Sequence, residues 1–196
     1  MKTVYDEQSR TAVFGGGCFW CTEAVFRMLK GVSNVEPGYA GGSIESPSYE
    51  RVSEGNTGHA QVIRITYDPT VISYEDLLTV FFGSHDPTTP NRQGTDTGEQ
   101  YRSVILYSSE DEKTVAEKMI QEMDDSLKDL PAPRDASRQA GGTRVVTQIV
   151  PLGKFFAAEE YHQKYFEKNT SAPYCQLIIK PKVEKVRMRF AELLNQ

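Results

Sequence analysis

The sequence predicts an α+β fold, a sandwich of helices and strands within a single domain of residues 1–196. Helical and strand patterns are mixed along the chain without the regular alternation of a doubly wound parallel sheet. A length of 196 residues, with no internal repeat, is typical of one compact domain. Hydrophobic residues make up 38% of the chain, and 15 glycines bring the total into the globular range, which excludes extensive disorder.

The N-terminal quarter contains a predicted strand, a glycine turn, a helix and a long loop. Residues 11–14 are apolar and predict a short buried strand, and Gly15-Gly16-Gly17 follows at once. From Cys18, apolar residues recur every three or four positions until Gly31, which predicts a helix. Residues 37–58 are rich in Gly, Pro and Ser and are typical of a functional loop.

A second strand and helix follow. Residues 60–67 alternate in polarity, and the alternation places Gln61 on the same inward face as the isoleucines of this strand. Ser73, with Asp76 three positions later, predicts a capped helix start and a helix through Phe82.

The middle of the chain combines a polar loop with strong helix and strand signals. Residues 85–100 are rich in Pro, Gly, Asp and Thr and predict a loop, and 104–107 predict a buried strand. Ser109 and Glu112 form a capping box that opens an amphipathic helix to about Leu127.

The C-terminal part is predicted to contain a strand, two helices and a turn. Residues 145–150 predict a strand ended by the following proline, and 157–168 predict a helix. Pro173-Tyr174-Cys175 is expected in a turn before the apolar run 177–179, and 182–194 predict a basic amphipathic helix.

Composition excludes several classes of function. A net charge of −5 and a pI near 5.3 give no general attraction to nucleic acid or anionic lipid. No apolar stretch is long enough to span a bilayer, and the polar start has no signal-peptide core. We therefore expect a cytoplasmic protein that binds neither nucleic acid nor membrane and is a monomer.

The three cysteines, Cys18, Cys21 and Cys175, indicate redox chemistry or a metal site. A zinc site would need one histidine (His59, His85 or His162) as fourth ligand, but no second closely spaced pair of ligands exists, so we expect no metal. A thioredoxin-like oxidoreductase also uses Cys-x-x-Cys, but there tryptophan precedes the first cysteine.

Cys18 is the strongest nucleophile candidate. Three glycines are expected to leave its thiol uncovered, and the positive end of a helix favours thiolate, so a lowered pKa is expected. Cys21 lies one turn further along the helix, so the helix N-terminus is expected to stabilise its thiolate less. Phe19 and Trp20 give an aromatic wall suited to a small apolar group such as a methyl. A phosphate-binding loop is disfavoured because the Gly-Lys-Ser/Thr ending is missing.

Gly17-Cys18-Phe19-Trp20, followed by Cys21, resembles the active-site signature of the methionine sulfoxide reductase A family. Further family-like blocks occur in family order over most of residues 11–180: Gly38-Tyr39-Ala40-Gly41-Gly42, Pro47-Ser48-Tyr49, Thr57-Gly58-His59-Ala60-Gln61, His85-Asp86-Pro87-Thr88, Arg92-Gln93-Gly94, Gln100-Tyr101-Arg102-Ser103, Ala158-Glu159-Glu160-Tyr161-His162-Gln163 and Pro173-Tyr174-Cys175. The resemblance implies a two-layer sandwich, with a mixed sheet, a ferredoxin-like core and the catalytic cysteine at a helix N-terminus.

The resemblance also implies a reaction. The Cys18 thiolate attacks the sulfur of the S epimer of methionine sulfoxide, in proteins or as the free amino acid, and becomes a sulfenic acid. Phe19 and Trp20 would hold the substrate methyl, and the hydroxyls of Tyr49 and Tyr101 would hydrogen-bond the sulfoxide oxygen.

The family resemblance gives supporting roles to three further residues. Asp96 would orient the substrate or its neighbours, and His162 would support the site from behind. The family normally has glutamate where this chain has Gln61. An amide donates a hydrogen bond but no proton, so the reductase step is expected to be slower.

Turnover requires a second thiol and an external reductant rather than a bound cofactor. The sulfenic acid would condense with a nearby thiol, and thioredoxin or another dithiol would reduce the disulfide. We expect Cys175, in its turn, to react first with Cys18, and Cys21 to relay the disulfide outward.

Overall fold

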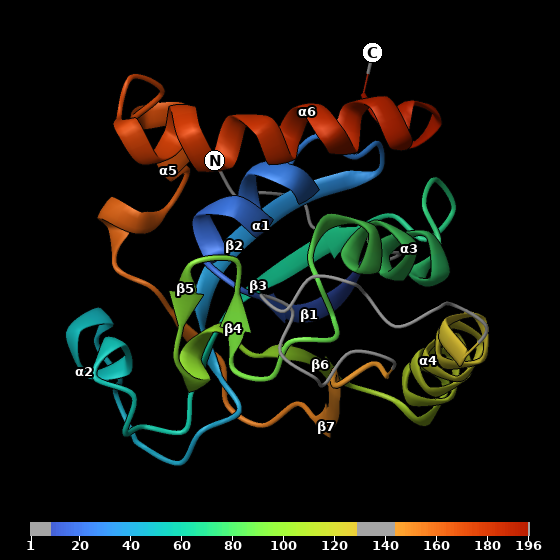
Figure 1. Cartoon of the computed structure of the whole chain (residues 1–196), viewed down its shortest axis with the longest axis horizontal. Helices are drawn as coiled ribbons and strands as arrows, with labels where there is room; N and C mark the ends of the chain where they lie inside the picture. The colour runs from blue at the N-terminus through green and yellow to red at the C-terminus, as the bar shows by residue number, and fades with distance from the viewer. Residues whose placement is uncertain (1–8, 129–143, 196) are drawn as a thin grey trace.

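A six-stranded mixed sheet lies at the centre of the protein, in a computed structural model that describes residues 9–128 and 144–195 (Figure 1). The strands lie in the order β7 (Gln148–Pro151), β6 (Ser103–Tyr107), β1 (Arg10–Gly16), β3 (Ala60–Tyr67), β2 (Val32–Ala40) and β8 (Phe156–Ala157). Neighbouring strands are antiparallel, except that β6 and β7 are parallel.

The four central strands have ferredoxin-like connectivity. Helix α1 (Phe19–Phe26) connects β1 to β2, a hairpin connects β2 to β3, and α3 (Tyr74–Ser84) lies between β3 and β6. The order β6-β1-β3-β2 with these helices is the βαββαβ arrangement. The predicted α+β class with a mixed sheet is therefore confirmed.

Alternation along the strands separates two apolar clusters, because successive side chains point to opposite faces of a sheet. The larger cluster, on the helix face, includes Phe14, Ile63 and Ile65 with residues of α1, α3 and α6 (Lys180–Arg189). The smaller cluster on the other face is covered in part by Leu152 and Phe155. The helix face is therefore the main core, and the functional candidates on α1 lie against it.

The remaining helices and short elements surround this sandwich (Figure 1). They are α2 (Tyr49–Ser53), the hairpin β4 (Arg92–Gln93) and β5 (Asp96–Thr97), η1 (Glu99–Tyr101), α4 (Glu110–Lys128), η2 (Glu160–His162), α5 (Tyr165–Lys168), the π-helix η3 (Cys175–Ile179) and η4 (Ala191–Leu193). Helix α6 runs above α1 in the view of Figure 1.

Several predicted elements are confirmed. Strand β3 has the predicted bounds, and Gln61 lies on its buried, inward face. At α3, Ser73 Oγ accepts from the Asp76 N–H at 3.0 Å, and the Asp76 carboxylate accepts from the Ser73 N–H at 3.1 Å. At α4, Ser109 Oγ accepts from the Glu112 N–H at 3.2 Å as predicted, but the Glu112 carboxylate accepts from the N–H of Ser108, one residue before the predicted cap.

The predicted loop 37–58 is wrong in part, because β2 continues to Ala40 and α2 follows. The sequence pattern did not predict this part of the strand, because Pro37 and Gly38 are both unfavourable inside strands. Gly38 is required by packing: a Cβ there would lie 2.4 Å from the Phe155 ring. The predicted loop 85–100 contains the small hairpin β4–β5 and η1.

Predicted bounds also fail at α1 and in the C-terminal part. Helix α1 ends at Phe26, short of the predicted end at Gly31. Strand β7 begins at Gln148 and includes Pro151 at the sheet edge.

The predicted helix over 157–168 and the predicted turn at Cys175 are also wrong. Residues 157–168 form β8, η2 and α5, because the chain crosses the β2 edge of the sheet before returning to α1. Cys175 lies in η3, which continues directly into α6, and α6 ends at Arg189 rather than at 194.

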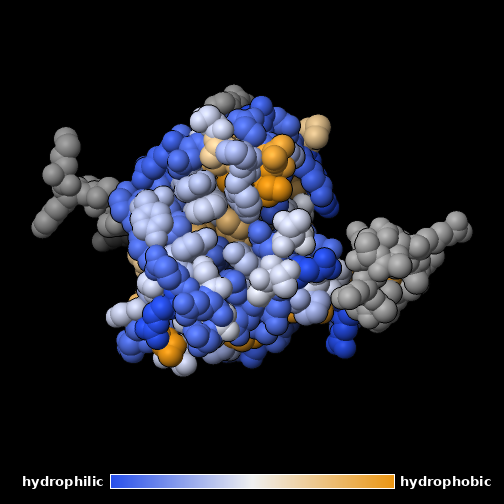
Figure 2. All heavy atoms as spheres, turned by 60° about the vertical axis from the view of Figure 1, so that its left-hand side comes forward, coloured by the Kyte–Doolittle hydropathy of each residue, from blue (hydrophilic) through white to orange (hydrophobic). Residues whose placement is uncertain are grey.

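Figure 2 shows a face on which hydrophilic residues predominate and hydrophobic residues form small groups. Within residues 9–128 and 144–195, no helix combines the length and hydropathy needed to cross a bilayer. The polar start of the chain, used above to argue against a signal peptide, lies outside the described residues.

The cap of α3 predicts a measurable loss of stability. Ser73→Ala removes the side-chain acceptor for the Asp76 N–H and should lower the free energy of unfolding by about 1 kcal/mol in urea titrations. Thr79→Ala is the control: Thr79 is exposed in the middle of the same helix and bonds only to the Glu75 carbonyl. Equal losses in both variants would contradict a capping role for Ser73.

Candidate active site

A glycine turn places Cys18 where β1 ends and α1 begins. Gly17 has a φ of +96°, a conformation that favours glycine. A Cβ on Gly17 would also lie 2.7 Å from Gln93 Cγ, so the β4–β5 hairpin can approach only a glycine here. Cys18 is the residue that precedes α1 and serves as its N-cap. The thiol is therefore held between the sheet, the helix and the hairpin.

The expected exposure and lowered pKa of Cys18 are wrong for this conformation. Cys18 is only 8% exposed. Burial, followed by the effect of the neighbouring Cys21, raises its pKa well above the ordinary thiol value. The reason is tertiary: the fold encloses the thiol, and the hydrogen bonds from Tyr174 and from the Trp20 N–H, which lower the pKa of Cys18, offset the effect of burial only in part.

Cys18 and Cys21 form a hydrogen-bonded thiol pair. The hydrogen bond from Cys18 lowers the pKa of Cys21 to about 7 against the opposing effect of burial, and Lys182 lowers it further. Within this pair, the contacts therefore favour ionisation of Cys21 over ionisation of Cys18. The positive end of α1 is therefore outweighed by burial at Cys18, which the glycine turn and the helix start do not reveal.

Gln61 connects the centre of the sheet to the start of α1. It is 1% exposed and lies opposite Tyr39 in the β2–β3 register. Its Oε1 accepts a hydrogen bond from the Phe19 N–H at 3.2 Å. A backbone N–H can only donate, so the oxygen must face Phe19 and the amide NH₂ is the end available to another acceptor.

Aromatic rings form a wall beside the thiol pair. Trp20 lies 6.4 Å from both Phe19 and Tyr49 between ring centroids, and it stacks on Tyr165 at 3.7 Å with an interplanar angle of 7°. The Trp20 indole N–H donates to His162 Nδ1 at 3.0 Å. The structure therefore brings His162 against the aromatic residues, as a support for Trp20.

His162 is held neutral by its surroundings. Burial lowers its pKa, and the bond from Trp20 occupies Nδ1, so the proton resides on Nε2. That Nε2 is buried without a hydrogen-bond partner among the described residues, and Glu159 Oε2 lies 4.0 Å away. The neutral ring can accept from Trp20, whereas a protonated ring could not.

Two phenols and a carboxylate lie near Cys18. Burial and then neighbouring groups, Cys18 among them, raise the pKa of Tyr49 and raise that of Tyr101 to about 12. Both hydroxyls therefore stay protonated and can donate. Asp96, on β5, accepts from the Tyr174 hydroxyl at 3.1 Å. Tyr49 and Tyr101 therefore lie close enough to Cys18 for its charge to affect them, and Asp96 acts on Cys21.

Cys175 does not lie in the expected turn, and the thiol that affects its pKa is Cys21 rather than Cys18. It is buried in η3, and burial followed by the nearby Cys21 raises its pKa. The preceding residue, Tyr174, has its hydroxyl 3.9 Å from Cys21 Sγ. A buried helical position, rather than a mobile turn, therefore holds this third thiol.

Sequence patterns did not identify Tyr174, Tyr165 and Glu159 as functional residues. Glu159 accepts from the Tyr39 hydroxyl at 2.8 Å and from the Tyr49 N–H at 2.9 Å, so it holds one of the two phenols in place. Tyr174 and Glu159 belong to blocks that resemble the family, which is the only signal the sequence offers. Their contacts join segments far apart in the chain.

The histidines do not support the zinc alternative. His59 contacts the Ile44 carbonyl at 2.8 Å, and His85 contacts Ser103 Oγ at 2.7 Å, so both rings serve hydrogen bonds elsewhere. Burial lowers the pKa of His85 to about 4. Across the two described ranges, no group of three or more His, Cys, Asp or Glu side chains has the geometry to hold a metal ion.

Comparisons with known proteins identify the family of this chain. The family model described as peptide methionine sulfoxide reductase matches residues 10–194. A relative from Sulfolobus acidocaldarius, a peptide methionine sulfoxide reductase MsrA, is 50% identical over 92% of this chain and 95% of its own. A second MsrA, from Haloquadratum walsbyi, is 50% identical over 95% of this chain and 99% of its own.

Solved structures agree with the fold. Reduced Mxr1 from Saccharomyces cerevisiae has a TM-score of 0.73 and 34% identity, covering 89% of this chain and 94% of its own. Methionine sulfoxide reductase A of Corynebacterium diphtheriae has a TM-score of 0.71 and 29% identity, covering 87% and 80%. The chain therefore belongs to the peptide methionine sulfoxide reductase family.

Proposed function

We propose that this protein reduces the S epimer of methionine sulfoxide, in oxidised proteins and as the free amino acid, to methionine. The observation that carries the proposal is the arrangement around Cys18: hydrogen-bond donors from Gln61, Tyr49 and Tyr101, together with an aromatic wall. A sulfoxide has the matching chemistry, a polar oxygen and a methyl group on one sulfur atom.

Substrate binding uses both parts of the site. The methyl group packs against Phe19 and Trp20, where burial of apolar surface favours it. The sulfoxide oxygen accepts hydrogen bonds from the Gln61 amide and from the two phenols, whose raised pKa values keep them as donors. Asp96 orients the substrate or its neighbours, in competition with its bond from Tyr174.

The chemical step begins with proton transfer inside the thiol pair. Cys18 passes its proton to the Cys21 thiolate, to which it already donates, and the resulting Cys18 thiolate attacks the sulfoxide sulfur. Charge develops on the sulfoxide oxygen, which the three donors stabilise. The oxygen takes up one proton and is transferred: its bond to the methionine sulfur breaks and a bond to the Cys18 sulfur forms as the two sulfur atoms separate. Methionine leaves as the thioether, and Cys18 becomes a sulfenic acid.

Gln61 separates hydrogen bonding from proton donation. Its amide can stabilise charge on the oxygen but cannot transfer a proton, so the proton must come from Tyr49, Tyr101 or water. A protonated glutamate would keep the bond from Phe19 and would also supply a proton. The family reaction is therefore slowed at this step in the present chain.

Recycling of Cys18 uses the two other thiols. Condensation of the sulfenic acid with a thiol forms a disulfide and releases water. Cys21 is hydrogen-bonded to Cys18, whereas Cys21 is the thiol whose charge affects Cys175. These contacts favour Cys21 as the first resolving thiol and Cys175 as the second, the reverse of the order expected from the sequence.

Thioredoxin is the proposed reductant of the final disulfide. The yeast relative Mxr1 has been solved in complex with Trx2. In this chain, Leu177 and Ile178 lie on the same π-helix as Cys175, and Leu177 is 73% exposed. An exposed apolar turn beside the last thiol suits a protein reductant, which must reach a sulfur atom through protein contacts.

Reduction of the two sulfoxide epimers tests the proposal. With thioredoxin, its reductase and NADPH, the protein should turn over S-methionine sulfoxide and not the R epimer. Cys18→Ser should abolish turnover because no sulfenic acid can form. Undiminished reduction by Cys18→Ser would contradict the proposal, and insulin reduction without any sulfoxide would instead indicate a thioredoxin-like oxidoreductase.

Restoring an acid at position 61 should accelerate the first step. Gln61→Glu places a carboxyl group at a buried position, where desolvation raises its pKa and keeps it protonated. The single-turnover rate of sulfoxide reduction, followed by rapid quench, should rise by about tenfold or more, as expected for a positioned general acid. An unchanged or lower rate, with the variant folded, would contradict this role for residue 61.

Mass spectrometry after one equivalent of substrate separates the resolving thiols. In Cys21→Ser, the Cys18 sulfenic acid should persist and react with dimedone. In Cys175→Ser, a disulfide between Cys18 and Cys21 should accumulate, because the first condensation is intact. The opposite pattern would make Cys175 the first resolving thiol.

A further inference from the structure

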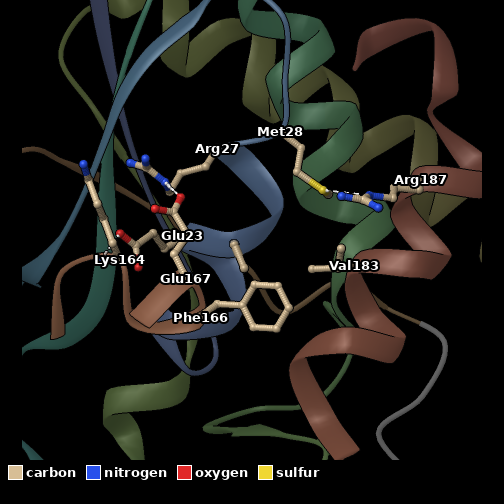
Figure 3. A pocket seen from close by; sticks show the side chains of 9 residues that line it. Glu23, Arg27, Met28, Lys164, Phe166, Glu167, Val183 and Arg187 are labelled. Atoms are coloured by element: carbon tan, nitrogen blue, oxygen red, sulfur yellow. Dashed lines mark hydrogen bonds and ion pairs between the residues drawn. The ribbon is translucent and has the colours of Figure 1, made fainter. Parts of the chain in front are cut away.

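A pocket of about 190 Å³ lies between α1, α5 and α6, further along α1 than the thiol pair (Figure 3). Charged side chains from these elements line it: Glu23, Arg27, Lys164, Glu167 and Arg187. In Figure 3, Glu23, Arg27 and Glu167 lie side by side, and Arg187 reaches toward Met28. Arg27 and Glu167 form an ion pair at 2.8 Å, whereas Arg187 donates to Met28 Sδ at 3.4 Å.

Glu23 differs from its charged neighbours because it is almost fully buried. Its side chain is 1% exposed, and its carboxylate accepts from two backbone N–H groups, Lys164 at 2.7 Å and Tyr165 at 3.3 Å. Burial raises the pKa of Glu23 to about 7, so holding a carboxylate here costs free energy. A buried acid that bonds a turn in another segment indicates a positioning function.

The turn that Glu23 holds is strained. Lys164 has a φ of +57°, a left-handed conformation that is unfavourable for a residue with a side chain. This conformation turns the chain so that Tyr165 points back to α1. The Tyr165 ring then stacks on Trp20 at 3.7 Å, nearly parallel to it.

Trp20 is therefore fixed from two sides by one short segment. Tyr165 sets the plane of the indole, and His162 accepts from its N–H at 3.0 Å. Glu23 lies one turn after Trp20 on α1. Its two hydrogen bonds therefore attach the 162–165 segment to the same helix that carries Trp20. Helix α1 thus contacts the Lys164–Tyr165 turn through Glu23, and the turn contacts the same helix again through the stacking of Tyr165 on Trp20.

We propose that Glu23 is a positioning residue for substrate binding, which holds Trp20 in place through the Lys164–Tyr165 turn. This inference rests on the proposed function, because it takes Trp20 as the wall that receives the substrate methyl. Glu23 touches neither thiol nor substrate. Its loss should loosen the Trp20 ring and weaken binding, while the thiol pair keeps its chemistry.

The single tryptophan of the chain makes the position of Trp20 directly measurable. Glu23→Ala should shift Trp20 emission to longer wavelength and increase its quenching by acrylamide, because the ring gains access to water. In single-turnover assays, the half-saturating sulfoxide concentration should rise by on the order of tenfold, with the maximal rate within about threefold. Alkylation of Cys18 by iodoacetamide should keep its wild-type rate.

Two further variants separate positioning from packing. Glu23→Gln keeps an oxygen that accepts a backbone N–H and should restore the emission and most of the binding. Glu167→Ala removes a carboxylate from the same pocket without touching the turn bonds and should leave both measurements unchanged. Circular dichroism reports the folding of each variant. If Glu23→Ala does not fold, Glu23→Asp replaces it. The shorter Asp side chain should not reach the turn and should give the same emission shift.

Several results would overturn the proposal. One is unchanged Trp20 emission and unchanged half-saturation in folded Glu23→Ala. Another is an equal effect of Glu167→Ala, which would assign the change to pocket packing. A parallel loss of Cys18 alkylation would assign Glu23 to the thiols. If the wild-type protein does not reduce the sulfoxide, the proposed function fails, whereas the emission of the Glu23 variants still tests the contact with Trp20.

Discussion

One hydrogen bond, from the Phe19 N–H to Gln61 Oε1, anchors the start of α1 to the central strand β3. Gly17 completes this anchor, because only a glycine permits the backbone conformation there and the close approach of Gln93. The helix that carries both thiols and Trp20 is thereby fixed to the sheet rather than to a loop. Groups that must meet a small substrate gain their precision from such a rigid support.

The site resolves a conflict between burial and ionisation. A dry site strengthens hydrogen bonds to an oxygen that gains charge, but the same burial raises the pKa of the Cys18 nucleophile. The thiol pair reduces this cost, because the hydrogen bond from Cys18 lowers the pKa of Cys21, so that ionisation of the pair is favoured at its second member. Tyr174 adds to the enclosure, with its hydroxyl donating to Asp96 at 3.1 Å.

Much of the fold could be predicted from the sequence, since many of its signals are local. The β3 strand, the α3 cap and the strand–glycine–Cys18–helix junction each depend on residues a few positions apart. The resemblance in short blocks also predicted which residues meet around Cys18. Strand β2 and the segment 157–168 were missed because Pro37, Gly38 and the β8 edge are explained only by strand pairing.

The sequence by itself determined that Cys18 stands between a glycine turn and a helix and which face of β3 carries Gln61, because alternation and motif spacing are properties of the local chain. Only the tertiary structure decided the protonation of Cys18, the burial of Cys175 and the support of Trp20 by Glu23 and Tyr165. The physical reason is that desolvation and hydrogen bonding depend on neighbours in space, which here come from distant segments of the chain.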